Sequence, residues 1–483
     1  MKKRKNILFL MTDQQRLDHI GYHGRGRLET PHMDRLAESV GFTGCTTVNP
    51  VCTPARSALL TGKYAHQIGM LNMSGDLSPL HPTYPKALQK AGYRTYGIGK
   101  FHWLQGWKWG TPPGRGHPLF SMKEQMKRFG FDEIREAAGK QLALQNHCDY
   151  CEDLERKGLL SAYREFVRSC GSYPRLAGPK MGGVVPFPFA EENYMDRWIA
   201  DQIIDAVDRR PKDAPFFIFG SFVGPHPPYD PPAAYLEKVP YEEVDDFIVG
   251  EGETPLSEEV KSKLYELRRA YKAMILYLDD QIGRILAKLE DDGLLDETVI
   301  LFTSDHGEML GDHGRMQKGS PYRSSLHVPA AIRHPDYLDR RLNDTPVEII
   351  DFAATILEIA GLDPQRELSL DWPAFHDSVP CRSLLKIVEG KAERVRDFAF
   401  AECDAAWQMV RSDRYKYVRY CHYKQADQVE EQLFDLETDP DETVNRIADP
   451  HLADVARQLR RQRELVMDMT PPAQLRWAPL IEE

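Results

Sequence analysis

The heptapeptide VCTPARS places a nucleophilic cysteine and an arginine at the predicted start of a helix. Pro54 is typical of the first helical position, Thr53 is a favoured N-cap, and Gly62 is a favoured end of such a helix. Cys52 would lie just before the helix, where free N–H groups and the helix dipole attract an anion. Arg56, one turn along, can point back at the same place. The spacing predicts a nucleophile in an oxyanion-binding cradle.

Two other interpretations of Cys52 remain open on this segment alone. A free cysteine is often a small core residue, and Cys52 would then precede an ordinary helix without a chemical role. A bare thiol at a helix start would instead have a lowered pKa and could act as a thiolate. Thiolate phosphatases, however, space their cysteine and arginine further apart around a phosphate loop than the C-x-P-x-R found here.

Further candidate residues follow two apolar runs that predict buried strands. Lys100 and His102 come after the run 95–98, and His226 follows the run 215–222. Ligand sites of open α/β sheets lie at the carboxyl ends of their strands. Each residue alone would more often be a solvated charge or an ordinary loop histidine. Their positions after strands favour a shared site.

Oxygen and imidazole donors follow two more predicted strands. Asp13 and Gln14 come after the run 6–11, and Asp305 and His306 come after a later apolar run. Carboxylate and amide oxygens suit Ca²⁺, whereas an imidazole also suits Mn²⁺ or Zn²⁺. A lone aspartate after a strand is commonly a turn residue. The prediction of one divalent metal site therefore rests on the two strand ends together.

Together these motifs resemble those of the sulfatase family, part of the alkaline phosphatase superfamily. The stretch CTPARSALLTGKY resembles the first sulfatase signature, and GYRTYGIGKFH resembles the second. The stretch GPHPPY resembles the family's His-x-Pro-Tyr loop, and MQKG resembles the segment of the second active-site lysine, here Lys318. The resemblance covers nearly the whole chain. This chain departs from the commonest family pattern at three positions. Relatives usually have serine at the position of Ala55, many have aspartate at that of Gln14, and many have asparagine at that of His306.

The resemblance implies hydrolysis of an aryl or carbohydrate sulfate ester by a formylglycine that a maturation enzyme makes from Cys52. One hydroxyl of the hydrated aldehyde would attack sulfur, while Lys100 and Lys318 hold the sulfate oxygens. His226 would protonate the leaving alcohol, and His102 would assist the hydrated aldehyde. The implied catalytic set is Cys52, Arg56, Lys100, His102, His226 and Lys318, and the implied metal ligands are Asp13, Gln14, Cys52, Asp305 and His306, with Ca²⁺ the expected ion and Mn²⁺ or Zn²⁺ the alternatives.

Two other functions remain open. Some bacterial relatives with Asp-His at the position of Asp305-His306 are choline sulfatases, and others are phosphonate monoester hydrolases. A phosphonate monoester or phosphodiester hydrolase on the same scaffold is therefore one alternative. The other is a noncatalytic metal-dependent binding protein, but such a protein needs no nucleophile such as Cys52.

The order of the predicted elements indicates an α/β fold. Apolar runs alternating with helices are typical of a large, mixed, mostly parallel sheet flanked by helices. After about residue 366, short strands separated by turns predict a small antiparallel sheet and a final helix. We predict a catalytic domain over 1–366 and a C-terminal subdomain over 367–483, as in sulfatases. The expected helices are 54–61, 257–290, 349–360 and 452–467, and the expected strands are 6–11, 95–98, 215–222, 298–303, 407–410, 415–421 and 431–436.

Composition limits the partners of the chain. Its 483 residues carry a formal net charge of −11, which argues against nonspecific binding to nucleic acid or to an anionic membrane. The basic start MKKRK precedes an apolar run too short for a secretory signal, and no run is long enough to span a membrane. We therefore expect a cytoplasmic enzyme.

Two features receive no predicted role. The eight cysteines are dispersed, which fits reduced thiols, and we interpret Cys148-x-x-Cys151, despite its redox or zinc spacing, as two incidental thiols. A Gly/Pro-rich stretch after the second signature carries aromatic and basic side chains. They form either a wall that stacks on a sugar or aryl group, or packing within a long loop. These residues are Trp103, Trp107, Trp109, Arg115 and His117.

Overall fold

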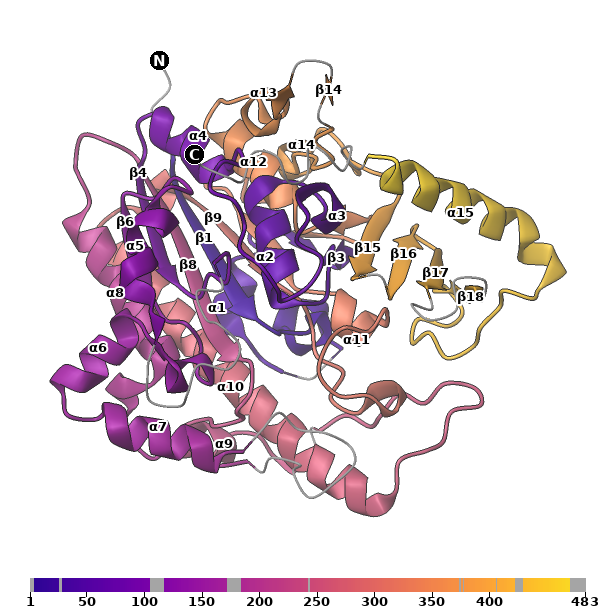
Figure 1. The fold of residues 1–483 in the computed structure, drawn as a ribbon, viewed down its shortest axis with the longest axis horizontal. Helices are drawn as coiled ribbons and strands as arrows, with labels where there is room; N and C mark the ends of the chain where they lie inside the picture. The colour runs from indigo at the N-terminus through magenta and orange to yellow at the C-terminus, as the bar shows by residue number, and fades with distance from the viewer. Residues whose placement is uncertain are drawn as a thin grey trace.

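A large mixed sheet forms the centre of the molecule (Figure 1). The computed structural model describes residues 4–25, 28–104, 117–171, 184–241, 244–372, 375–376, 378–404, 406–421 and 429–469. In spatial order the eight strands are β11 (Arg341–Asn343), β2 (Val40–Phe42), β10 (Ala330–Arg333), β9 (Thr298–Ser304), β1 (Asn6–Asp13), β8 (Phe216–Pro225), β4 (Arg94–Gly99) and β6 (Glu133–Glu136). All neighbouring pairs are parallel except the two that involve β10. The predicted mixed, mostly parallel sheet is confirmed.

Helices cover both faces of this sheet, which explains why its central strands are apolar throughout. In β1, Phe9 belongs to the core on one face, while Leu8 and Leu10 belong to the core on the other. A strand that is buried on both faces has a continuous run of apolar residues in its sequence, and not an alternation of apolar and polar residues. Helices α2 (Cys52–Thr61), α4 (Tyr84–Lys90) and α12 (Asp351–Ile359) contribute to the first core, and α1 (Pro31–Arg35), α8 (Met195–Arg209) and α10 (Glu258–Asp291) to the second.

The predicted helix boundaries hold closely, with one correction. The side chain of Ser257 caps α10 by accepting a hydrogen bond from the Val260 N–H. The prediction that Thr53 caps α2 is wrong, because the helix begins at Cys52 and its N-cap is the residue before. Pro54 is thus the third helical residue, where its missing N–H has no partner within the helix in any case. The preference of proline for the first helical position therefore misplaced the helix start by two residues, and Cys52 is the first residue of the helix rather than the residue just before it.

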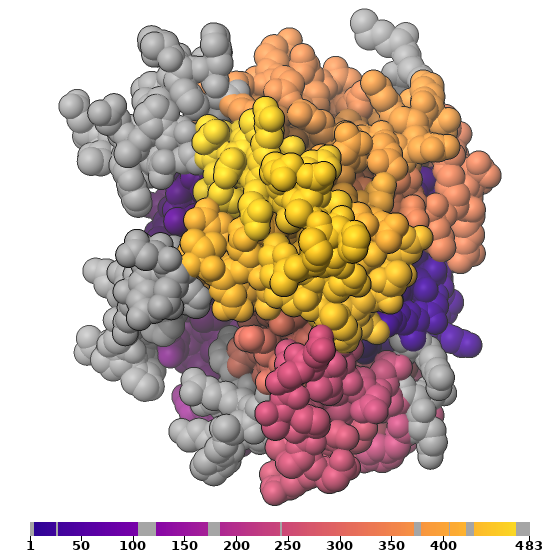
Figure 2. All heavy atoms as spheres, turned by 90° about the vertical axis from the view of Figure 1, so that its right-hand side faces the viewer, coloured from indigo at the N-terminus to yellow at the C-terminus, as the bar shows by residue number. Residues whose placement is uncertain are grey.

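A four-stranded antiparallel sheet follows, as predicted. It consists of β15 (Ala399–Cys403), β16 (Trp407–Arg411), β17 (Tyr415–Cys421) and β18 (Val429–Asp435), with α15 (Ala453–Met467) after it. Phe400 and Val410 share one hydrophobic core with Phe9 of the large sheet. Figure 2, in which the right-hand side of Figure 1 faces the viewer, shows the C-terminal residues in yellow across the middle of the molecule. The boundary after residue 366 falls within α13 (Pro364–Leu368) and stays a prediction.

The remaining helices are short, and several lie below the large sheet in Figure 1. Within the described ranges, no helix is both long enough and apolar enough to cross a membrane. The bounds of these helices are α3 (Ala65–Ile68), α5 (Leu119–Lys127), α6 (Asp149–Arg156), α7 (Leu160–Ser169), α9 (Ala233–Glu237), α11 (Arg323–Leu326) and α14 (Leu385–Val388).

Candidate active site

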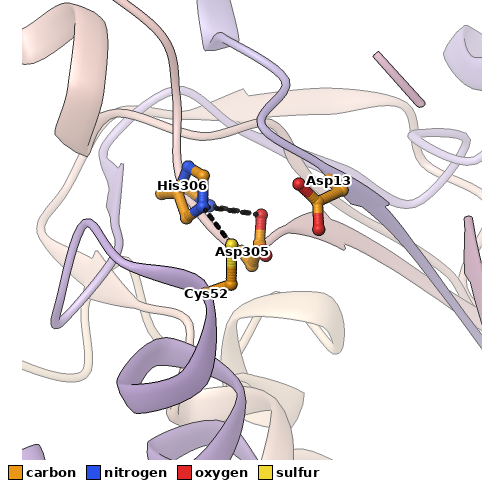
Figure 3. Close-up of side chains that lie close together, drawn as sticks. All are labelled: Asp13, Cys52, Asp305 and His306. Carbon is orange, nitrogen blue, oxygen red and sulfur yellow. Dashed lines mark hydrogen bonds and ion pairs between the residues drawn. The ribbon is translucent and has the colours of Figure 1, made fainter. Parts of the chain in front are cut away.

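Four of the predicted site residues converge where the central strands end. Asp13 ends β1, Asp305 and His306 follow β9, and Cys52 is the first residue of α2. One ligand atom from each of these side chains lies within 4.8 Å of all the others, and all four residues are buried. Figure 3 shows the sulfur of Cys52 directed at the His306 ring from the helix start. The parallel sheet therefore brings the two predicted strand ends together.

Arg56 joins the two carboxylates. Its Nε donates to Asp305 Oδ2 at 2.8 Å, and its Nη2 donates to Asp13 Oδ2 at 2.7 Å. Its Nη1 donates to the carbonyl oxygen of Lys100 at 2.6 Å and to Ser221 Oγ at 2.8 Å. The guanidinium is about 1% exposed. Arg56 is therefore a fixed part of the site, one helical turn after Cys52 as predicted.

Two lysines approach the same centre, Lys100 after strand β4 and Lys318 from the loop that follows β9. Lys100, at the end of β4, lies 2.7 Å from Asp13 Oδ2 through its Nζ. Lys318 Nζ lies 2.8 Å from Cys52 Sγ and 3.2 Å from His306 Nε2. Burial raises the pKa of the Cys52 thiol, but the charges of Lys318 and Lys100 outweigh it and hold that pKa well below its usual value. The centre favours an anion at position 52.

Gln14 lies beside the cluster of Asp13, Cys52, Asp305 and His306, and hydrogen bonds from its backbone and its side chain hold it there. Its N–H donates to Asp305 Oδ1 at 3.0 Å, and its Oε1 accepts a hydrogen bond from Lys318 Nζ at 3.0 Å. Its Nε2 donates to Glu308. The φ angle of Gln14 is +70°. A non-glycine residue in the left-handed region is strained, and such strain persists where the surroundings hold the residue in place.

The two predicted histidines both lie at the site. Burial and the charge of Lys100 lower the pKa of His102 to about 4. Burial, together with Lys100 and Lys318, holds the pKa of His226 well below its usual value. His226 Nδ1 lies 2.7 Å from the carbonyl oxygen of Pro227. A carbonyl only accepts, so Nδ1 carries a proton and Nε2 is the atom that gains or loses one.

Sequence reasoning missed several residues that hold this centre together. Glu308, fully buried, accepts hydrogen bonds from Gln14 and from the Leu310 N–H, and it lies in the same SDHGE segment as Asp305. Its position three residues after Asp305 could have been used to predict that Glu308 lies at the site. Trp407 of the small sheet donates through Nε1 to the carbonyl oxygen of Gly319, beside Lys318, at 2.9 Å. Nothing near Trp407 in the sequence indicates that contact.

Trp103 packs in the core rather than in a wall for substrate. It is 1% exposed, stacks on Phe101 with ring centroids 4.9 Å apart, and donates through Nε1 to the carbonyl oxygen of Arg56. Its packing supports the helix that carries Arg56. Trp107, Trp109 and Arg115 lie outside the described residues, as does the side chain of His117.

The donor set of the cluster fits a divalent metal. Within the described part of the chain, Asp13 Oδ1 is buried and has no hydrogen-bond partner. A buried carboxylate oxygen left without a partner is costly unless something binds it. Two carboxylates and an imidazole are common ligands of divalent ions. The cluster therefore has both the geometry and an available oxygen for such an ion.

Comparison with known proteins identifies the family. The family model described as Sulfatase matches residues 5–362, and the model described as N-sulphoglucosamine sulphohydrolase, C-terminal, matches residues 311–468. The chain therefore belongs to the sulfatase family, and it is a sulfuric ester hydrolase.

Individual relatives agree with this assignment. An arylsulfatase of Clostridium perfringens is 29% identical over 92% of this chain and 90% of its own. An N-acetylglucosamine-6-O-sulfatase of Bacteroides thetaiotaomicron is 27% identical over 75% of this chain and 68% of its own. A phosphonate monoester hydrolase from Silicibacter pomeroyi, 23% identical, shares the fold with a TM-score of 0.75 over 98% of this chain and 97% of its own.

Proposed function

We propose that this chain hydrolyses aryl or carbohydrate sulfate esters through a formylglycine made from Cys52 beside one divalent metal ion. One observation above all supports the proposal. Cys52 begins a helix with its sulfur against Lys318 and His306, inside a buried cluster of metal-ligand type. A formylglycine-generating maturation enzyme is then a required partner. The names of the two sulfatase relatives support aryl and amino-sugar sulfates as the substrate classes.

The metal would be held by Asp13, Gln14, Asp305 and His306, with the modified residue 52 completing the site. When bound, the ion would polarise a sulfate oxygen as a Lewis acid. Ca²⁺ is the expected ion, and the imidazole of His306 also admits Mn²⁺ or Zn²⁺. Formylglycine would supply a hydroxyl of its hydrated aldehyde as the nucleophile.

The chain's own cations would hold the substrate and the developing charge. Lys318 reaches the position 52 side chain, and Lys100 reaches Asp13, so the two ammonium groups lie around the same centre. Donors fixed before reaction stabilise charge most effectively, because the site does not have to reorganise. Arg56, held by four hydrogen bonds, keeps the two carboxylates in place. His102 is mostly neutral at pH 7, which suits a group that accepts a proton from the hydrated aldehyde.

His226 would protonate the leaving oxygen. Its imidazole is fixed by the Nδ1 hydrogen bond to Pro227 and by a loop with three prolines, Pro225, Pro227 and Pro228. An alkoxide is a poor leaving group and needs this proton, whereas a nitrophenolate does not. We expect His226→Ala to slow alkyl or sugar sulfates by about 10²–10⁴-fold and activated aryl sulfates much less. Steady-state kinetics on both substrate types measure the contrast.

The pH dependence follows from the lowered pKa of His226. The acid must be protonated, so its contribution is present below that pKa and is lost as pH rises through it. For alkyl sulfates, kcat/KM should therefore fall with rising pH from below neutrality, because kcat/KM reports the free enzyme.

His334→Ala is a matched control for the contrast between the two substrate types. His334 is a buried histidine that follows β10, and because β10 runs antiparallel to β9, it lies near the start of β9 and not near the site at its end. Equal losses for both substrate types with His226→Ala would make His226 a sulfate-binding or structural residue.

A phosphonate monoester or phosphodiester hydrolase is the second candidate. The observation that favours it is the imidazole at the cluster, where His306 Nε2 lies 3.2 Å from Cys52 Sγ. Turnover of an aryl sulfate and of an aryl phosphonate monoester by one preparation decides between the two. We expect the larger kcat/KM for the sulfate ester. A larger value for the phosphonate would transfer the proposal to that substrate class.

A further inference from the structure

The two cysteines of the C-x-x-C segment lie in contact at the start of a helix. Cys148 is the N-cap of α6, Cys151 is its third residue, and their sulfur atoms lie 3.6 Å apart. Both side chains are buried, at about 1% and 0% exposed. A disulfide needs about 2.05 Å between its sulfurs, so closure requires an approach of only about 1.5 Å. The pair is therefore arranged to form a bond within one helical turn.

This dithiol is connected to the active site through one short segment. The Ala138 carbonyl oxygen lies 3.2 Å from Nε2 of the active-site His102. Asp149, between the cysteines, accepts a hydrogen bond from the Glu136 N–H at 2.8 Å. Any shift of the helix start therefore moves the segment against which His102 is held.

The next residue of that segment also borders the catalytic centre. A Cβ atom placed on Gly139 would lie 3.9 Å from Nζ of Lys100, so the segment runs directly past this lysine. The segment is thus packed between the dithiol and two residues of the proposed site.

We propose that Cys148 and Cys151 form a reversible disulfide, an oxidative modification that displaces Ala138 and thereby lowers turnover through His102. Formation of the bond stands on the sulfur geometry alone. Its effect on turnover rests on the proposed function. The two cysteines act here as positioning residues, since neither touches the reacting atoms.

The reaction with a low-molecular-weight disulfide balances as a simple exchange. Both sulfurs are buried, so exchange proceeds when local opening of the helix start admits the reagent. The Cys151 thiolate, favoured by the hydrogen bond from the Cys148 thiol, then attacks one reagent sulfur and releases one reagent thiolate. The Cys148 thiol loses its proton and displaces the second reagent thiolate from the mixed disulfide. The protein loses two electrons and two protons, and the reagent is reduced to two thiols.

Equilibration with oxidised and reduced glutathione tests the bond. We expect excess oxidised glutathione to convert the peptide around Cys148 and Cys151 to a form lighter by two hydrogens, with no glutathione retained. Dithiothreitol should reverse the change. Cys148→Ala and Cys151→Ala should both lack it. Cys170→Ala should keep it, because Cys170 is a buried thiol of the same core outside the pair. Two thiols that stay reduced at equilibrium overturn the proposal.

Turnover of the formylglycine-bearing protein tests the link to the site. Displacements of about 1 Å at an active site can cost about 10²-fold. Only part of the sulfurs' approach reaches His102 through Ala138, so we expect kcat to fall about tenfold, with a changed pH profile. The two alanine variants should not respond to the oxidant, and Cys170→Ala should respond fully. A disulfide with unchanged kcat and pH profile overturns the link. The mass readout decides on the bond even if the protein hydrolyses no sulfate ester.

Discussion

Replacing Cys52 with alanine is expected to lower aryl sulfate turnover by about 10⁶-fold, the loss seen when a hydrolase loses its covalent nucleophile. The variant keeps the helix, because Cys52 has no capping role and the first hydrogen bond of α2 runs from the Ala55 N–H to Val51. The cations would remain, so residual binding of the substrate is compatible with the loss. The measurement is kcat, with a thermal melt to show that the variant is folded.

Active wild-type protein should carry formylglycine at position 52. Conversion removes the sulfur and two hydrogens and adds one oxygen, which peptide mass analysis detects, and the aldehyde should react with an aminooxy probe. Cys45 is the internal control, because it is also buried but burial raises its pKa, and its peptide should keep an intact thiol. Cys45→Ala should leave the probe reaction unchanged.

An unmodified thiol at position 52 in active protein would change the proposed nucleophile. Lys318 and Lys100 hold the pKa of the Cys52 thiol well below its usual value, which favours the thiolate of an unmodified cysteine in this site. Fully active protein with an intact thiol at position 52 would therefore replace formylglycine with thiolate chemistry. It would leave the fold and the family unaffected.

The central strands were predictable because burial on both faces leaves a simple sequence signal. Strands β1, β4 and β9 each contain a predicted apolar run, and β8 begins one residue after the start of its predicted run. The sheet edges were not predictable in this way. Strand β11 is a three-residue edge strand with Leu342 58% exposed, and β6 has the sequence EIRE, which resembles a loop. Their pairing depends on neighbours that are distant in the sequence.

The candidate site shows the same division between local and distant signals. Asp13, Asp305 and Lys100 were predictable because each follows an apolar strand, and the parallel sheet brings strand ends together. The contact of Trp407 with Gly319 depends on the packing of the small sheet against the Lys318 segment. The 3.6 Å separation of the paired thiols depends on where α6 begins, which spacing alone left undecided.

Substitution of Asp305 is expected to remove both metal and activity. Its Oδ2 binds Arg56, and its Oδ1 accepts hydrogen bonds from the Gln14 and His306 N–H groups, at 3.0 and 2.9 Å. Asp305 thus orders two other proposed ligands besides supplying its own oxygens. Lewis-acid stabilisation is worth several kcal/mol, so Asp305→Ala should lower kcat/KM by at least about 10³-fold. Elemental analysis of the purified protein should show about one metal per chain in wild type and none in the variant.

Two further variants separate metal loss from loss of fold. Asp305→Asn keeps the shape of the side chain but removes its charge and sets an NH2 group against either Arg56 or the Gln14 and His306 N–H groups. It should therefore lose metal and melt at a lower temperature than wild type, but in one cooperative transition that shows that the protein is folded. Asp196→Asn is the matched control. Asp196 is a buried carboxylate that accepts two backbone hydrogen bonds, from Val223 and Gly224 at 2.7 and 3.0 Å, but it lies outside the cluster. It should retain its metal. Normal turnover by Asp305→Ala without bound metal would show that the metal site is misplaced, and metal loss in Asp196→Asn would show that burial, not ligation, explains the result.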